Sequence, residues 1–189
     1  MTEGGEQIGR LLNLYRNYLR LLAQVEIGRR LQAKVDASDL VQEAMLEAHK
    51  SFAGFRGGSE GEFVAWLRQI MTRVLCACVR RYLGTRKRDI RLEMTLSEGL
   101  DHSSLLLGRG LYDRHSSPSQ GAVRREQAVQ FADALAQLPE HYRDVLVLRH
   151  LEGLSFPEIA QRMGRSQDSV EKLWVRGLDR LRQVLEVTP

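Results

Sequence analysis

Residues 154–174 read Leu154-Ser-Phe-Pro-Glu-Ile-Ala-Gln-Arg-Met-Gly-Arg-Ser-Gln-Asp-Ser-Val-Glu-Lys-Leu-Trp174. The small, turn-forming and apolar residues of this stretch have the spacing of two short helices that cross steeply. Ile159 and Ala160 fall on the first predicted helix, and Val170 and Leu173 fall on the second. Ala160 is small enough to let the two helices approach. The pattern predicts a helix-turn-helix, which makes DNA the first partner to consider.

Local signals fix where these two helices begin and end. Ser155 and Glu158 form a capping box, and Pro157 sits in the first turn, where its missing N–H costs nothing. Gly164 can adopt the left-handed conformation that ends a helix, and Ser166 is placed to cap the next one. The alternative, an ordinary helical hairpin, does not require Ala, Gly and Val at these offsets together.

The composition favours an all-α protein. The chain has 189 residues, 6% aromatic residues and a formal net charge of +4, with few β-branched alternations. The first residues carry no signal-peptide pattern, and no apolar run approaches the roughly 20 residues of a membrane span. We therefore expect no membrane insertion and a cytoplasmic location. The basic excess suggests an anionic partner without proving one.

The two cysteines, Cys76 and Cys78, are separated by one residue, so on a helix they would point about 200° apart. An unstrained disulfide between them is excluded. The histidines are scattered and there is no C-x-x-C pair, so we expect no metal site, no cofactor and no catalytic residues.

Charge and turn residues divide the chain into three parts. Residues 1–91 and 125–189 are helical in pattern, whereas residues 92–124 contain five glycine or proline positions and no sustained apolar period. The sequence predicts two small helical domains joined by a flexible linker over 92–124. Within that linker Leu105-Leu106-Leu107 is too apolar for a solvated tether, so part of it is expected to dock as a short helix or in a partner's groove.

The first domain carries two charged surfaces. Amphipathic helices are predicted over residues 8–31 and 38–52, and Asp39, Glu43 and Glu47 recur every four residues on the second one. This acidic stripe is a solvated face or a docking surface for a basic partner. Residues 54–92 hold nine basic and three acidic side chains. The arginines of the long helix that follows Phe63 are Arg68, Arg73, Arg80 and Arg81.

That basic ridge lies beside a glycine-rich loop, residues 54–61, which carries Phe55. Arginines next to exposed aromatic rings suit single-stranded nucleic acid, because the phosphates take the charges and unstacked bases take the rings. The alternative is a solvated basic face.

The second domain is predicted as four helices, with helices over 125–137 and 139–150 packed against the helix-turn-helix. Recognition helices place their first turns deepest in the major groove. We therefore expect base contacts from Gln167, Ser169, Glu171 and Lys172, and backbone contacts from Arg165 and Arg176. Asp168 is expected to cap its helix, and Trp174 to pack inside.

Three stretches resemble the extracytoplasmic-function (ECF) sigma factors of bacterial RNA polymerase. They are Asp39-Leu-Val-Gln-Glu-Ala-Met-Leu-Glu-Ala-His49, the segment from Phe52-Ala-Gly-Phe-Arg-Gly57 to Phe63-Val-Ala-Trp-Leu-Arg68, and residues 138–155. The resemblance implies that Asp39, Gln42 and Glu43 dock on the β′ clamp helices of core polymerase and that Phe55 holds a flipped −10 base. It further implies promoter DNA, the β flap and an anti-sigma protein as partners, and a specificity subunit that is not an enzyme.

The sequence also departs from the family pattern. Thr72-Arg-Val-Leu-Cys-Ala-Cys78 replaces a −10-reading segment that often carries Asn, and Ser169-Val-Glu-Lys-Leu-Trp174 replaces a Gly-Thr-Val-Lys-Ser-Arg type of run. The promoter sequence therefore cannot be carried over. Two other functions stay open at this point: a free-standing dimeric helix-turn-helix regulator, and a redox or metal sensor that uses Cys76 and Cys78.

Overall fold

The computed structural model describes residues 3–30, 35–83, 90–109 and 121–187, and all regular structure in these ranges is helical. The prediction of an all-α protein is confirmed. The helices are α1 (Glu3–Leu14), α2 (Arg16–Arg30), α3 (Ala37–Ser51), the 3-10 turn η1 (Phe52–Gly54), α4 (Glu60–Leu83), α5 (Ile90–Arg109), α6 (Gly121–Ala136), α7 (Glu140–His150), α8 (Phe156–Met163) and α9 (Gln167–Val187).

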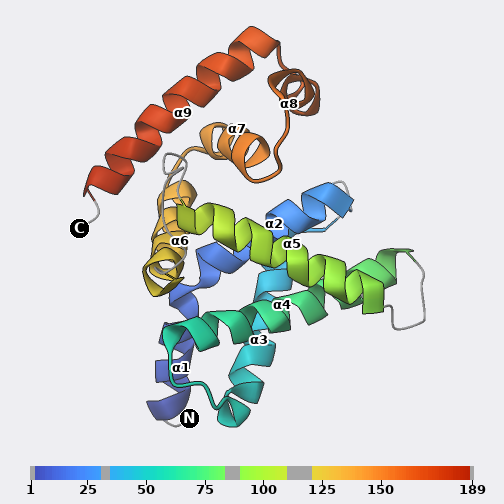
Figure 1. The fold of residues 1–189 in the computed structure, drawn as a ribbon, viewed down its shortest axis with the longest axis vertical. Helices are drawn as coiled ribbons and strands as arrows, with labels where there is room; N and C mark the ends of the chain where they lie inside the picture. The colour runs from blue at the N-terminus through green and yellow to red at the C-terminus, as the bar shows by residue number, and fades with distance from the viewer. Residues whose placement is uncertain (1–2, 31–34, 84–89, 110–120, 188–189) are drawn as a thin grey trace.

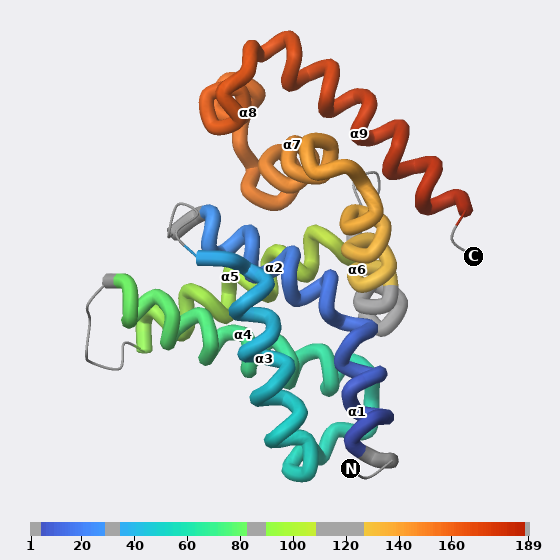
Figure 2. The backbone as a smooth tube through the Cα atoms, turned by 180° about the vertical axis from the view of Figure 1, so that it is seen from behind, coloured from blue at the N-terminus to red at the C-terminus, as the bar shows by residue number. Residues whose placement is uncertain are grey.

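Helices α1 to α4 pack together at one end of the molecule (Figures 1 and 2). Helix α3 begins at Asp36, whose carboxylate accepts a hydrogen bond from the Ser38 amide at 2.8 Å. The buried side of α3 consists of Leu40, Val41, Ala44 and Ala48, which meet the apolar face of α4. Burial of these regularly spaced apolar side chains stabilises the helices that carry them.

The single helix predicted over residues 8–31 is wrong, because the chain leaves helical structure at Tyr15, between α1 and α2. The Tyr15 ring packs edge-on against Phe63 at a centroid distance of 5.3 Å. Its hydroxyl donates to the Glu60 Oε1 atom at 3.1 Å. Burial of the ring and this contact with a carboxylate raise the pKa of Tyr15 to about 12.

Helix α5 corrects the prediction of a flexible linker. Residues 90–109 form a helix that packs against α2, α4 and α6, and Leu96, Leu100 and Leu107 are buried in the core. The docking expected for Leu105-Leu106-Leu107 occurs through Leu107, whereas Leu105 is exposed. Residues 110–120 of the predicted linker lie outside the described residues.

Helices α7 to α9 form the other end of the molecule, with α9 running along its outer edge (Figure 1). Helix α6 was predicted to pack against the helix-turn-helix, but it packs mainly against α5 and α2. Polar contacts link α2 to the later helices α6 and α8. The Asn17 amide donates to Asp133 Oδ1 at 2.8 Å, and the Arg162 guanidinium reaches the Gly28 carbonyl oxygen at 3.2 Å. Between them lies a cavity of about 630 Å³ lined by charged side chains that include Arg20, Arg143 and Arg162.

Candidate nucleic-acid interface

The helix-turn-helix has the caps that the sequence predicts. The Glu158 carboxylate accepts a hydrogen bond from the Ser155 amide at 2.7 Å, and the Ser155 side chain accepts one from the Glu158 amide, so both halves of the capping box are formed. Gly164 ends α8 with φ of 62°, a left-handed conformation that glycine adopts without strain. The Ser166 hydroxyl then accepts from the Ser169 amide at 3.3 Å and caps α9.

Helix α9 lies close to α7 because Gly177 has no side chain at their contact. A Cβ atom there would be 3.4 Å from the Leu146 side chain and 3.4 Å from the Tyr142 carbonyl oxygen. Ile159 and Val170 are fully buried beneath the turn. This packing fixes the side of α9 that faces away from the protein.

Trp174 packs inside the domain, as predicted. Its indole N–H donates to the His150 Nε2 atom at 2.9 Å, and its ring meets Phe156 edge-on at 5.5 Å. The Arg149 guanidinium lies 4.7 Å from the centre of the Phe156 ring and donates to the Leu154 carbonyl at 2.8 Å. Burial, followed by the charge of Arg149, lowers the pKa of His150. A neutral His150 is the form that accepts the Trp174 hydrogen bond.

The outward face of α9 carries the side chains that the sequence assigns to base contacts. Gln167 and Lys172 are exposed, and Ser169 and Glu171 are half-buried. Gln167 donates to Glu171 at 2.7 Å, and Lys172 pairs with Asp168 at 2.6 Å. Arg165 and Arg176 are both exposed beside them. The structure therefore gathers all six predicted side chains at the surface of one motif.

A second surface is built around four aromatic rings at the start of α4. Phe55 and Trp66 lie 5.0 Å apart between ring centroids, and Phe52 and Phe63 complete the cluster. Phe55 and Trp66 are half-buried, so parts of both rings face solvent. A Cβ atom on Gly57 would come within 2.2 Å of the Phe55 ring, so any larger residue at this position would displace the ring.

The loop that follows Phe55 is held by Glu62. The Glu62 carboxylate accepts from the Gly58 amide at 2.9 Å, the Ser59 amide at 3.1 Å and the Ser59 hydroxyl at 3.0 Å. These hydrogen bonds, with the Gly58 amide first, lower the pKa of Glu62. The loop is therefore ordered by a cap at the start of α4, which positions Phe55 beside Trp66.

Arginines continue this surface along α4. Arg73 and Arg81 are exposed, and Arg80 is partly buried, with its Nε atom donating to the Cys76 carbonyl at 3.1 Å. Trp66, Arg73 and Arg80 follow one another at seven-residue intervals, so they share one side of the helix. Aromatic rings and guanidinium groups therefore lie along the same face.

On α3, the predicted acidic surface is exposed. Asp39, Gln42 and Glu43 face solvent, opposite the buried Leu40, Val41, Ala44 and Ala48 of the same helix. Leu46, 56% exposed, belongs to this surface by its spacing from Gln42 and Glu43. The surface thus has an apolar residue among acidic and polar ones.

Comparison with known proteins identifies the two halves. The family model of sigma-70 region 2 matches residues 14–85, and that of sigma-70 region 4 matches residues 128–181. The chain is similar to the ECF RNA polymerase sigma-E factor of Haemophilus influenzae, with 31% identity over 71% of this chain and 66% of the relative. The chain belongs to the ECF group of the sigma-70 family.

Further similarities fall within the same family. The ECF RNA polymerase sigma factor SigW of Bacillus subtilis is 28% identical over 79% of this chain and 75% of the relative. A solved structure of the sigma factor RpoE in complex with the anti-sigma factor NepR, from Bartonella quintana, covers 100% of both chains with 18% identity and a TM-score of 0.33.

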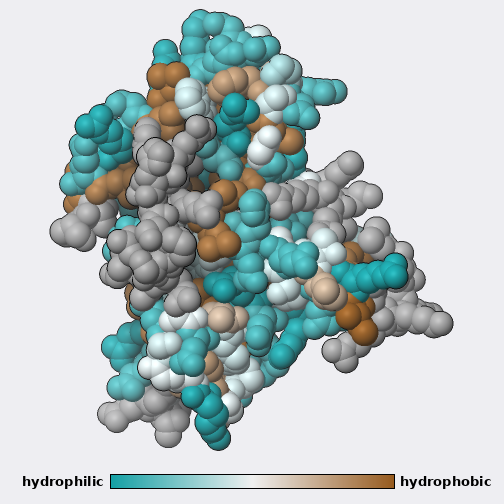
Figure 3. Space-filling model, viewed as in Figure 1, coloured by the Kyte–Doolittle hydropathy of each residue, from teal (hydrophilic) through white to brown (hydrophobic). Residues whose placement is uncertain are grey.

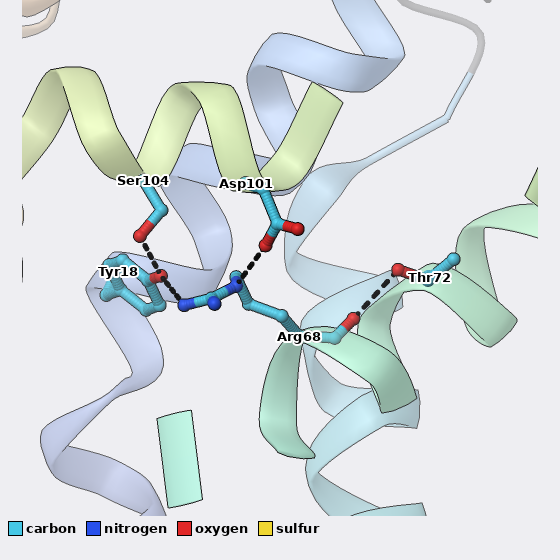
Figure 4. Close-up of polar contacts among 5 residues, drawn as sticks. All are labelled: Tyr18, Arg68, Thr72, Asp101 and Ser104. Atoms are coloured by element: carbon cyan, nitrogen blue, oxygen red, sulfur yellow. Dashed lines mark hydrogen bonds and ion pairs between the residues drawn. The ribbon is translucent and has the colours of Figure 1, made fainter. Parts of the chain in front are cut away.

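In this sigma factor the Arg68 side chain extends from α4 toward Tyr18 on α2 and Asp101 on α5, as Figure 4 shows. Its Nε atom donates to Asp101 Oδ1 on α5 at 2.8 Å, and its Nη1 atom donates to the Tyr18 hydroxyl on α2 at 3.3 Å. Its side chain is only 18% exposed. The sequence placed Arg68 with the nucleic-acid contacts, but in the structure it joins three helices.

Three surface residues were not predicted from the sequence. Trp66 was given no contact of its own, yet it packs against Phe55 and lies on the same side of α4 as Arg73. Leu46 and Val175 were not assigned a contact, although they are 56% and 57% exposed. The signal for both was present in the sequence, because each is an apolar residue at an outward position of an amphipathic helix.

Figure 3 shows a largely hydrophilic surface over the visible side of this sigma factor, with apolar surface near the start of α5, where Ile90 and Met94 are exposed. Cys76 and Cys78 are buried and form no disulfide, and burial raises the pKa of Cys78. Among the described residues, no group of His, Cys, Asp or Glu side chains could hold a metal ion. None of the described helices is both long and apolar enough to cross a membrane.

Proposed function

We propose that this chain is a promoter-specificity subunit that binds core RNA polymerase, contacts the −35 element as duplex and the −10 element as a melted strand, and catalyses no reaction itself. The observation that carries the proposal is the presence, in one chain, of a capped helix-turn-helix and a separate aromatic and basic face on α4. The first surface suits duplex DNA and the second suits unpaired bases.

We assign −35 recognition to α9. Gln167, Ser169, Glu171 and Lys172 lie in its first turns, where a recognition helix meets base edges. Glu171 can accept a hydrogen bond from a cytosine amino group, and its carboxylate has capacity beyond the bond from Gln167. Arg165 and Arg176 flank these residues and would bind phosphates.

We assign −10 recognition to the cluster at the start of α4. Phe55 and Trp66 offer ring faces to an unpaired base, and Arg73, Arg80 and Arg81 offer charge to the strand's phosphates. Arg68 is assigned a positioning role instead, because it is engaged by Asp101 and Tyr18. Arg73 and Arg81 are exposed and Arg80 is partly exposed, whereas the Arg68 side chain is largely buried and bonded to Asp101 and Tyr18.

We assign core binding to the α3 surface formed by Asp39, Gln42, Glu43 and Leu46, with the β′ clamp helices as its partner. A docking surface with an apolar centre and charged surroundings resembles the core and rim of protein interfaces. The region 4 half would contact the β flap, and an anti-sigma protein is a further proposed partner. The site of action is the cytoplasm, where the polymerase works.

Reconstituted transcription tests the function. Purified full-length chain is mixed with core RNA polymerase and a pool of promoter templates, and both co-purification with core and transcripts are measured. We expect a stable complex and initiation on a subset of templates. A chain that dimerises, binds a palindrome without polymerase and supports no initiation would contradict the proposal and favour a free-standing regulator.

A further inference from the structure

Val175 interrupts the polar outward face of α9. It is 57% exposed, while Glu171 and Lys172 precede it by one turn and Arg176 follows it. An exposed valine side chain is not stabilised by its contact with water, and it contributes nothing to the hydrophobic core. Its exposure is therefore unexplained by packing.

The spacing of this face matches base-contacting positions of recognition helices. Such helices contact bases from residues spaced i, i+3, i+4 and i+7. Asp168, Glu171, Lys172 and Val175 have this spacing, and together with Arg176 they line a shallow hollow of about 260 Å³ on the surface. Val175 lies about 12 Å along the helix axis from Gln167, which is within reach of a major groove about 12 Å wide.

The charged neighbours of Val175 are engaged with one another along the helix. Lys172 pairs with Asp168 at 2.6 Å, and Glu171 accepts from Gln167 at 2.7 Å. Each pair joins residues four positions apart, so the two contacts run parallel to the axis toward the start of α9. The side chain one turn further on, Val175, is left exposed at the end of both pairs.

We propose that Val175 is a specificity-determining residue that reads the C5-methyl group of a thymine in the upstream promoter element. Thymine is the one standard base that presents a methyl group in the major groove, and an apolar side chain is the group that recognises it. This inference rests on the proposed −35 role of α9 and adds the identity of one base.

Deoxyuridine provides the test, because it pairs as thymine does and keeps the O4 acceptor but lacks the methyl group. Holoenzyme assembled from the full chain and core polymerase selects from two promoter pools with the same randomised upstream segment. One pool carries thymine in that segment and the other carries uracil. At the position contacted by Val175, we expect enrichment of thymine to exceed that of uracil about fourfold, the effect of one buried methyl group.

Two variants assign the effect to a residue. With Val175→Ala, the difference between thymine and uracil should shrink, because the smaller side chain makes less contact with the methyl group. This variant should fold because the side chain is exposed. Val187→Ala is the matched control, since Val187 is also exposed on α9, at 82%, but lies in the last turn. It should retain the difference between the pools.

The outcomes separate the two proposals. If the holoenzyme enriches no upstream sequence from either pool, the −35 role of α9 fails. If upstream sequences are enriched but thymine and uracil are equivalent, base reading by α9 stands and the role of Val175 is overturned. A difference between the pools that is undiminished in Val175→Ala also overturns it, because another residue then contacts the methyl group.

Discussion

Tyr18 and Ser104 are 86 positions apart in the sequence, and the Tyr18 hydroxyl donates to the Ser104 hydroxyl oxygen at 2.7 Å in the protein interior. The same Tyr18 oxygen accepts from Arg68 at 3.3 Å (Figure 4). Three helices, α2, α4 and α5, therefore meet at one phenolic oxygen. The contact is polar, directional and buried, so its loss leaves partners unsatisfied.

Replacing Tyr18 with phenylalanine should lower the free energy of unfolding by about 1–3 kcal/mol, because Ser104 and Arg68 each lose a buried partner. Urea denaturation followed by circular dichroism measures this. Tyr82→Phe is the matched control, since Tyr82 is 50% exposed, and it should change stability by less than about 0.5 kcal/mol. Equal stabilities for the two variants would show that the Tyr18 contacts contribute nothing.

Gly57 and Gly58 offer a paired test of the aromatic loop. A Cβ atom at Gly57 would meet the Phe55 ring at 2.2 Å, whereas one at Gly58 meets nothing within 4 Å. Gly57→Ala should displace Phe55 and weaken promoter melting, measured as open-complex formation by permanganate reactivity. Gly58→Ala should melt promoters normally. Similar melting by both variants would separate the position of Phe55 from −10 recognition.

Charge reversal on α3 tests the docking surface. Replacing Asp39 and Glu43 together with lysine should weaken binding to core polymerase about tenfold or more, because like charges would then face a basic partner. The helical content should not change, since both side chains are exposed. Glu98→Lys, an exposed reversal on α5, controls for net charge and should bind core normally. Affinity is measured by fluorescence titration of labelled chain with core.

Acidification should destabilise the region 4 half through His150. Burial lowers the pKa of His150 below its ordinary value of 6.5 in the folded state, so its stabilising contribution is complete above 6.5 and is lost as the pH falls below it. Unfolding in urea, followed by tryptophan fluorescence at about pH 7.5 and about pH 5.5, measures the loss.

His150→Gln should remove much of this pH dependence while keeping an acceptor for Trp174. The control is His141→Gln, because His141 is an exposed histidine on the same helix, α7. If His141→Gln flattens the profile and His150→Gln does not, the assignment to His150 is wrong.

Two substitutions on α9 should separate base reading from phosphate binding. Glu171→Gln should relax the preference at one base pair, because a neutral amide loses the selective acceptor for cytosine. Arg176→Ala should weaken all sequences alike and reduce the salt dependence of binding by about one unit. Competition binding with single-base promoter variants at several salt concentrations distinguishes the two effects, and a uniform loss in Glu171→Gln would make Glu171 a non-specific contact.

The helix-turn-helix could be predicted from sequence because its signals are local. The Ser155 and Glu158 capping box, the turn at Gly164 and the Ser166 cap all involve residues within a few positions of one another. The region around Phe55 was also predictable as an aromatic loop before a long helix. Its partner ring, Trp66, was not, because helical spacing alone does not distinguish a core ring from one at the edge of the core.

Helix α5 was missed because its buried face is partly polar. Gly99 packs against the buried Glu26, where a Cβ atom would lie 2.4 Å from the carboxylate, and Ser103 and Ser104 are buried as well. Glycine and serine in these positions look like turn residues in the sequence. The break at Tyr15 was not predicted because the sequence has no turn residue there. The apolar pattern continues across it without glycine or proline.

Helix α5 is also much shorter than the same residues would be in an extended conformation. Its 20 residues span about 30 Å as a helix and would span about 66 Å if extended. Because α5 lies between the two proposed promoter contacts in the sequence, unwinding it would let them separate by about 36 Å more. In the structure, α5 is held against α2 and α4 by the hydrogen bonds of Arg68, Tyr18, Asp101 and Ser104.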